Sequence, residues 1–261
     1  MSFYTTDQTE RSRSVLDQLV ALVPTATLIG GWGTWVRLYG QMSHDIDLIV
    51  SHDDLTLLRA QLGDFSTSDH VGGKKYRGDF NRIHVDLYVP HQSRLGNKLQ
   101  LRVEDLTQDC ESVNGYNVLS VEAHIATKFA ALLDRPDSLP GEKDRYEIIG
   151  LMESFAADPL KVRTIIERAT SHTPTSLNDL MNDLAKYLLE YRPDVSHGGL
   201  SREQKKMIQS FGSAISIPLS PGLADLQFPI YPESGVAFVG PYTKRNGQRI
   251  KGYPNPKQKR L

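Results

Sequence analysis

The sequence contains a single cysteine, Cys110, among its 261 residues. One thiol excludes an internal disulfide and a zinc site built from several cysteines. The eight histidines include no His-x-x-x-His pair of the kind that binds metals on a helix. No apolar run approaches the ~20 residues of a membrane-spanning helix, and the first residues lack the basic and apolar regions of a secretory signal. We therefore expect a cytoplasmic protein without membrane contact.

Negative charge is absent from one end of the chain. The formal net charge is −1, yet no acidic residue follows Glu233. Half of the fourteen prolines lie from Pro218 onward, which disfavours a long helix or a central strand there. Tyr242 and Tyr253 are interleaved with seven basic residues: Lys244, Arg245, Arg249, Lys251, Lys257, Lys259 and Arg260. We expect an extended arm that binds RNA by phosphate attraction and base stacking; a solubilising or partner-binding tail is the alternative.

Two glycines followed by two carboxylates are the most informative pattern in the sequence. An apolar run ends in Gly30-Gly31, thirteen residues follow, and Asp45 and Asp47 then alternate with apolar residues. Side chains i and i+2 of a strand point to the same face, so the two carboxylates should converge. Glycines at a helix start let backbone N–H groups approach an anion, and paired carboxylates suit Mg²⁺ that bridges to phosphates. The pattern indicates phosphoryl or nucleotidyl transfer, whereas either half alone is common in turns and exposed strands.

A third carboxylate lies in a later apolar run. Residues 82–89 alternate as a strand, with Ile83, Val85, Leu87 and Val89 on one face and His84, Asp86 and Tyr88 on the other. If this strand pairs beside residues 46–50, Asp86 completes a three-carboxylate site. Such a site can hold two metal ions about 3.5–4 Å apart. A solvated polar face on an edge strand is the alternative for Asp86 alone.

These elements resemble the nucleotidyltransferase superfamily of the polymerase β type, and most closely the nucleotidyltransferase toxins of abortive-infection toxin–antitoxin pairs. Residues 120–135 are similar to the family helix that carries a lysine and a closing arginine, and residues 142–148 are similar to its Lys-Asp-x-x-Asp element. The resemblance covers roughly residues 25–155. Two positions depart from it. Gln41 stands where the family has an arginine, so that anion contact is either missing or supplied by Arg37. Glu147 replaces the second aspartate of the last element.

The resemblance implies a mechanism and a set of site residues. Asp45, Asp47 and Asp86 would be catalytic and would bind two Mg²⁺ ions, with Asp86 taking the proton of the acceptor hydroxyl. The nucleoside triphosphate would contact Gly30, Gly31, Ser43, Lys128, Lys143 and Asp144. The implied acceptor is RNA, such as a tRNA end, and an antitoxin protein is the implied partner. From helical spacing alone, a snorkelling Lys128 and a surface ion-pair cluster around Lys143 and Asp144 stay open.

Two other functions stay open beside the RNA-modifying toxin. One is a nucleotidyltransferase that acts on a small molecule, as in antibiotic adenylylation. An acidic pocket for a cationic drug would favour it, and the sequence shows no acidic cluster beyond the three carboxylates. The other is a non-catalytic nucleotide- or RNA-binding module, which the presence of all three carboxylates disfavours.

The expected fold class is α+β. We expect a nucleotidyltransferase-type mixed sheet flanked by helices in residues 1–117, a helical domain in 118–215 and the basic arm in 216–261. Predicted helices are 9–23, 53–62, 120–134, 142–154, 159–170, 176–191 and 201–212, and predicted strands are 25–29, 46–50, 65–71 and 83–89. Asn114-Gly115 marks a hairpin turn. Residues 72–78 are predicted as a basic loop, either a solvated hairpin tip or a contact for triphosphate or acceptor.

Overall fold

A seven-stranded mixed sheet forms the centre of the N-terminal half of the protein. The structure is a computed structural model that describes residues 6–212, apart from 41, 71, 174 and 191–199, together with four two-residue strands between 238 and 254. The strand order is β3-β4-β5-β2-β1-β9-β8. Its strands are β1 (Thr27–Ile29), β2 (Ile46–Ile49), β3 (Gly63–His70), β4 (Gly73–Phe80), β5 (Ile83–Tyr88), β8 (Cys110–Val113) and β9 (Tyr116–Leu119). The pairs β2–β5 and β1–β9 are parallel, and the other neighbours are antiparallel.

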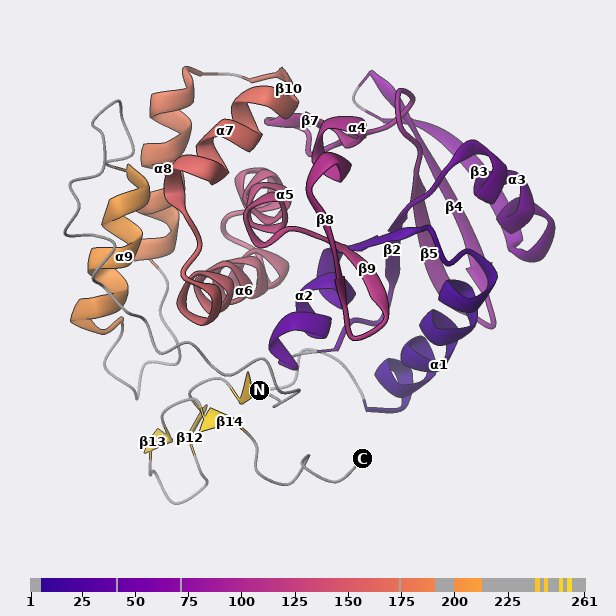
Figure 1. Ribbon diagram of the computed structural model, residues 1–261, viewed down its shortest axis with the longest axis horizontal. Coiled ribbons are helices and arrows are strands. Elements are labelled where there is room, and N and C mark those ends of the chain that lie inside the picture. Colours follow the sequence, from indigo (N-terminus) through magenta and orange to yellow (C-terminus); the bar gives the residue numbers. More distant parts are fainter. Residues whose placement is uncertain are drawn as a thin grey trace.

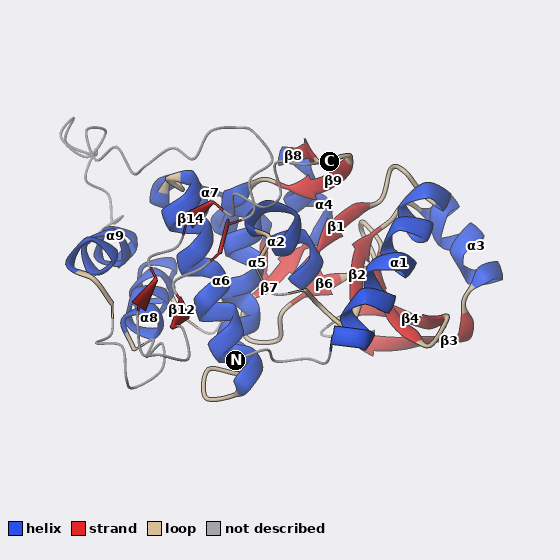
Figure 2. Cartoon of the chain, turned by 90° about the horizontal axis from the view of Figure 1, so that it is seen from below, coloured by secondary structure: helices blue, strands red, loops and turns tan. Residues whose placement is uncertain are grey.

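Helices cover the sheet and build the second half of the described chain. They are α1 (Thr6–Leu22), α2 (Gly30–Leu38), α3 (His52–Gln61), α4 (Val103–Leu106), α5 (Val121–Asp134), α6 (Leu139–Phe155), α7 (Pro159–Ala169), α8 (Leu177–Leu189) and α9 (Arg202–Gly212). Figure 1 shows α1 and α3 beside β3–β5, while α5 to α9 gather at the other end of the molecule, and Figure 2 shows the same division from below. A small sheet of β10 (Thr170–His172), β7 (Gln100–Arg102) and β6 (Arg94–Leu95) lies between. The expected α+β class is confirmed.

Side-chain caps mark the starts of several helices, and α6 begins at Leu139, three residues before its predicted start. Oγ of Ser51 accepts from the Asp54 N–H at 3.0 Å, which satisfies one orphan donor of the first turn of α3. Ser120, Ser138, Asp158 and Ser176 cap α5, α6, α7 and α8 in the same manner. Among the described residues, none of the helices is both long enough and apolar enough to cross a bilayer.

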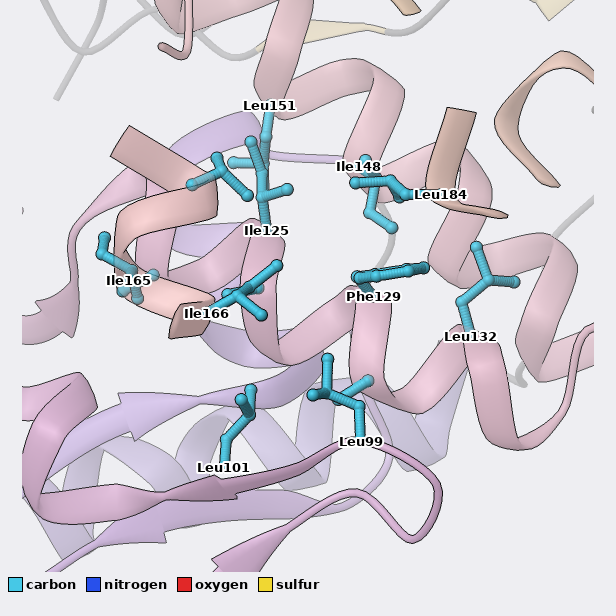
Figure 3. Packing of buried hydrophobic residues seen from close by; sticks show 14 of the residues in the cluster. Leu99, Leu101, Ile125, Phe129, Leu132, Ile148, Leu151, Ile165, Ile166 and Leu184 are labelled. Carbon is cyan, nitrogen blue, oxygen red and sulfur yellow. The ribbon is translucent and has the colours of Figure 1, made fainter. Parts of the chain in front are cut away.

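The two faces of the sheet pack into two different cores. Ile46 and Leu48 of β2, with Val85 and Leu87 of β5, pack with α1 and α3 in one apolar cluster. Ile49, Tyr88 and Leu119 belong instead to the cluster formed with α5 to α9. Figure 3 shows that cluster, in which Phe129 of α5 lies among Leu99, Leu132 and Ile148. Because neighbouring residues of a strand alternate between faces, Asp47 and Asp86 project toward the side of α5 and α6.

One predicted loop is a strand. Residues 72–78, expected as a basic loop, lie almost wholly in β4, which pairs with both β3 and β5. The reason is Tyr76, which is buried and stacks on Phe65 of β3 with ring centroids 6.2 Å apart. The sequence Lys75-Tyr76-Arg77 is therefore a polar–apolar alternation, and the surrounding glycines and lysines obscured it. As a result β5 is an interior strand and not the edge strand of the alternative for Asp86.

The expected basic arm is described only in part. Within it the structure describes the pairs β11 (Phe238–Val239) with β14 (Tyr253–Pro254) and β12 (Tyr242–Thr243) with β13 (Arg249–Ile250). Of its seven basic residues, only Arg249 falls in these strands, and the other six lie outside the described residues. The three-part division of the chain stays a prediction.

Candidate functional site

The two glycines form a shelf on which Asp47 and Ser43 rest. Gly30 follows β1, begins α2 and has a φ of +64°, a conformation that L side chains rarely adopt. A Cβ at Gly30 would lie 2.2 Å from Oδ2 of Asp47, and one at Gly31 would lie 2.8 Å from Oγ of Ser43 and 3.0 Å from Nζ of Lys143. Glycine is therefore required for these side chains to approach the start of α2. The structure brings together five of the predicted site residues here, and Lys143 among them comes from α6.

A buried histidine contacts the backbone of the glycine shelf. Nε2 of His124 on α5 lies 3.1 Å from the carbonyl oxygen of Gly30 and 3.4 Å from Oγ1 of Thr34. Burial, followed by the charges of Lys128 and Arg37, lowers the pKa of His124 to about 3, so the ring is neutral. Neutral imidazole has one N–H, and the tautomer protonated at Nε2 donates it to Gly30. Sequence reasoning missed His124; its position one helical turn before Lys128 was the available signal.

The two carboxylate strands are neighbours, which is the condition for Asp86 to join the other two carboxylates. β2 and β5 pair in parallel with Asp47 opposite Asp86, so their side chains leave the same face of adjacent strands. Burial, then the charges of Asp45 and Asp86, raises the pKa of Asp47 to about 7. The three carboxylates therefore act on one another electrostatically. Desolvation and like charge both disfavour the ionised form of Asp47 when no cation is bound.

Asp45 lies where the chain enters β2 and is held in its charged form. Oγ of Ser43 donates to Oδ1 of Asp45 at 2.7 Å. Burial alone would raise the pKa of Asp45, but the hydrogen bond from Ser43 and the charges of His44 and Lys143 leave it below the usual value. Ser43 thus contacts both the shelf and a carboxylate.

The donor set suits a hard cation shared with a phosphate ligand. Across the described ranges of the chain, no group of three or more His, Cys, Asp and Glu side chains is arranged to hold a metal ion. Mg²⁺, however, is usually bound by one or two carboxylates plus phosphate oxygens. The pair Asp45 and Asp47 meets that need, and the raised pKa of Asp47 marks negative charge that a cation would stabilise. The expectation of two ions stays a prediction.

Asp86 is buried and forms ion pairs with β4. Nζ of Lys75 lies 2.6 Å from Oδ2 of Asp86, and Nε and Nη2 of Arg77 donate to Oδ1 and Oδ2 at 2.6 and 2.9 Å. These contacts raise the pKa of Arg77 above its already high value, chiefly through the hydrogen bonds to Asp86. Sequence reasoning included both cations only as part of a basic loop that could contact triphosphate or acceptor, and it did not predict their ion pairs with Asp86.

Charged side chains from α5 and α6 form a buried network next to the shelf. Nζ of Lys128 is 3.2 Å from Oδ1 of Asp144 and also contacts Glu147. Nη2 of Arg135 lies 2.8 Å from Oδ2 of Asp144, and Nζ of Lys143 lies 3.7 Å from Oε1 of Glu147. Burial opposes the charge of Lys128, but Glu147 and Asp144 outweigh it and raise its pKa. Lys128 is therefore not a snorkelling lysine, and the buried Lys143 and Asp144 do not form a surface cluster.

The two lysines of this network differ in their surroundings. Burial lowers the pKa of Lys143 even though Glu147 attracts its charge. Lys143 reaches Gly31, whereas Lys128 is paired with Asp144 and Glu147 of α6. Arg37, the candidate substitute for the family arginine, forms an ion pair with Glu111 at 2.8 Å. Gln41 lies outside the described residues.

Comparisons with known proteins find only distant similarity. No family model matches the chain, and no curated protein matches it. Among solved structures, JHP933 from Helicobacter pylori is 13% identical, with a TM-score of 0.42, over 81% of this chain and 91% of that one. An antigenic nucleotidyltransferase-like protein from Paracoccidioides brasiliensis is 16% identical, with a TM-score of 0.36, over 70% and 93%. The Megavirus polyadenylate synthase is 10% identical, with a TM-score of 0.34, over 98% and 57%. All three are too distant for their names to indicate a function for this chain.

Proposed function

We propose that this protein is a nucleotidyltransferase, which moves a nucleoside monophosphate from a nucleoside triphosphate to a hydroxyl group. One observation carries the proposal: Asp47 lies opposite Asp86 on parallel strands and rests against the left-handed Gly30 at the start of α2. A helix start with an approachable backbone binds phosphates, and carboxylates next to it bind the cation that accompanies them. A phosphate subsite and a cation subsite thus share one corner of the sheet.

Each residue of the site has a role in the transfer. The triphosphate lies over Gly30 and Gly31, with Ser43, Lys143 and Lys128 stabilising its charge; Asp144 holds Lys128 in place. Mg²⁺ held by Asp45 and Asp47 supplies charge neutralisation at the phosphates. The acceptor oxygen forms a bond to the α-phosphorus, the bond between the α- and β-phosphates breaks, and pyrophosphate leaves. The hydroxyl proton passes to Asp86. Positioning and electrostatic stabilisation account for most of the rate.

The proposal includes an RNA acceptor and a toxin role in the cytoplasm. It is supported by the seven basic residues after Glu233, which suit phosphate attraction, and by the resemblance of residues 120–135 and 142–148 to the toxin elements. A toxin that modifies RNA requires restraint in its own cell, so an antitoxin protein is the proposed partner.

The test is a transfer assay with matched variants. Purified protein is incubated with Mg²⁺, total cellular RNA and each of the four nucleoside triphosphates labelled at the α-phosphate. We expect label in an RNA band with the wild type and none with Asp45→Asn or Asp47→Asn. Growth arrest on expression, lost in the same variants, tests the toxin role separately. Wild-type protein that labels nothing, with any triphosphate, would refute the proposed activity.

A further inference from the structure

Two cations share the sheet face of the carboxylates. β4 and β5 are antiparallel neighbours with Arg77 opposite Asp86, and β2 lies on the other side of β5 with Asp47 opposite Asp86. Arg77, Asp86 and Asp47 therefore form one row across three strands, with side chains on the same face. Lys75 precedes Arg77 by two residues in β4 and shares that face.

The positive charge of Lys75 and Arg77 together exceeds the negative charge of Asp86. Both contact its carboxylate, so two positive charges oppose one negative charge. The Lys75 ammonium also lies 5.6 Å from the centroid of the Tyr88 ring, on the same face. Its positive charge also acts on Asp47, whose pKa it lowers while Asp45 and Asp86 raise it. This edge of the site therefore attracts anions, whereas the Asp45 and Asp47 side attracts cations.

Exposure shows which partner faces solvent. The side chain of Asp86 is 8% exposed, whereas those of Lys75 and Arg77 are 21% and 54% exposed. A guanidinium has five N–H groups in a planar fork that matches phosphate. Within the described residues Arg77 uses only Nε and Nη2, both toward Asp86. Its outer edge is therefore available to a ligand that approaches from solvent.

We propose that Lys75 and Arg77 form a phosphate subsite for the acceptor, which makes the acceptor a polynucleotide whose terminal hydroxyl lies at Asp86. The inference rests on the proposed function. In phosphoryl transfer the attacking and leaving oxygens lie roughly in line. With the triphosphate over Gly30 and Gly31, the acceptor approaches along the row from the side of β4. A cationic small molecule would meet two positive charges there, whereas a nucleic acid strand brings its phosphates to them.

Binding of a single-stranded RNA measures the subsite directly. The probe is a fluorescein-labelled oligoadenylate of twelve nucleotides, followed by fluorescence anisotropy at several salt concentrations. Lys75→Gln and Arg77→Gln should each weaken binding several-fold and reduce the slope of log affinity against log salt by about 0.7, the value for one lost phosphate contact with a single strand. Lys161→Gln is the matched control, because Lys161 is an exposed cation of α7 that pairs with Glu122; its binding and slope should equal those of the wild type.

Kinetics and a conservative variant separate this inference from its alternatives. In the transfer assay, KM for RNA should rise in Lys75→Gln and Arg77→Gln while KM for the triphosphate stays within twofold. Arg77→Lys, which keeps the charge and the ion pair with Asp86, should bind RNA more weakly with an unchanged salt slope. A rise in KM for the triphosphate instead would assign the pair to the nucleotide and overturn the inference. Transfer activity with unchanged RNA binding in both glutamine variants would overturn it too, while leaving the proposed function intact.

Discussion

Substituting Gly30 by alanine tests the shelf most directly. Two costs add in this variant. A φ of +64° disfavours an L side chain by about 1–2 kcal/mol. The new Cβ would also lie 2.2 Å from Oδ2 of Asp47, so the carboxylate has to move by roughly 1 Å to reach ordinary contact distance. A misplacement of that size costs about 100-fold in rate. We therefore expect Gly30→Ala to lower the rate of nucleotide transfer by about that factor.

Gly115→Ala is the matched control for the backbone cost alone. Gly115 has a φ of +84° in the hairpin turn between β8 and β9, and a Cβ there meets nothing within 4 Å. Gly115→Ala should therefore lose about 1–2 kcal/mol in free energy of unfolding, which corresponds to a melting temperature lower by about 2–8 °C, and Gly30→Ala should lose at least as much. Only Gly30→Ala should lose about 100-fold in kcat for nucleotide transfer. Equal kcat values in the two variants would refute the role of Gly30 in positioning the Asp47 carboxylate.

Three further measurements test the electrostatics of the site. His124 is neutral in the folded protein, with a pKa of about 3, but takes a proton in the unfolded chain below pH 6.5. Its contribution to stability is therefore present above pH 6.5 and lost as the pH falls toward 3. Between these pH values the free energy of unfolding, measured with urea, should fall less in His124→Gln than in the wild type. Glu147→Ala leaves the buried Lys128 and Lys143 without a shared carboxylate and should lower the free energy of unfolding by about 3–5 kcal/mol. Glu147→Asp keeps a carboxylate and restores the aspartate of the Lys-Asp-x-x-Asp element, so its loss in the same urea assay should be much smaller. At ten times its dissociation constant, Mg²⁺ should stabilise the wild type by about 1.4 kcal/mol; equal thermal shifts in the wild type and in Asp47→Asn would contradict metal binding at that carboxylate.

Local signals in the sequence account for the elements that it predicted correctly. Caps such as Ser51 and Ser120 act within three residues, and the alternation in residues 83–89 follows from the two faces of a strand. The Asn114-Gly115 turn is readable because both residues adopt positive φ, as a two-residue hairpin requires. The same locality explains the error at β4. Within residues 72–78 the one apolar anchor is Tyr76, whose burial depends on a contact with Phe65 on another strand, and the segment contains no longer apolar pattern.

The sequence by itself determined the α+β class, most helix starts and the presence of three carboxylates near two glycines, because propensity, capping and alternation are properties of short segments. Only the tertiary structure decided which groups meet: Asp47 with Asp86, Gly30 with His124 across 94 residues, and Asp86 with Lys75 and Arg77. Strand order and register choose these partners. They follow from how the whole chain buries its apolar faces, and no window of the sequence contains that information.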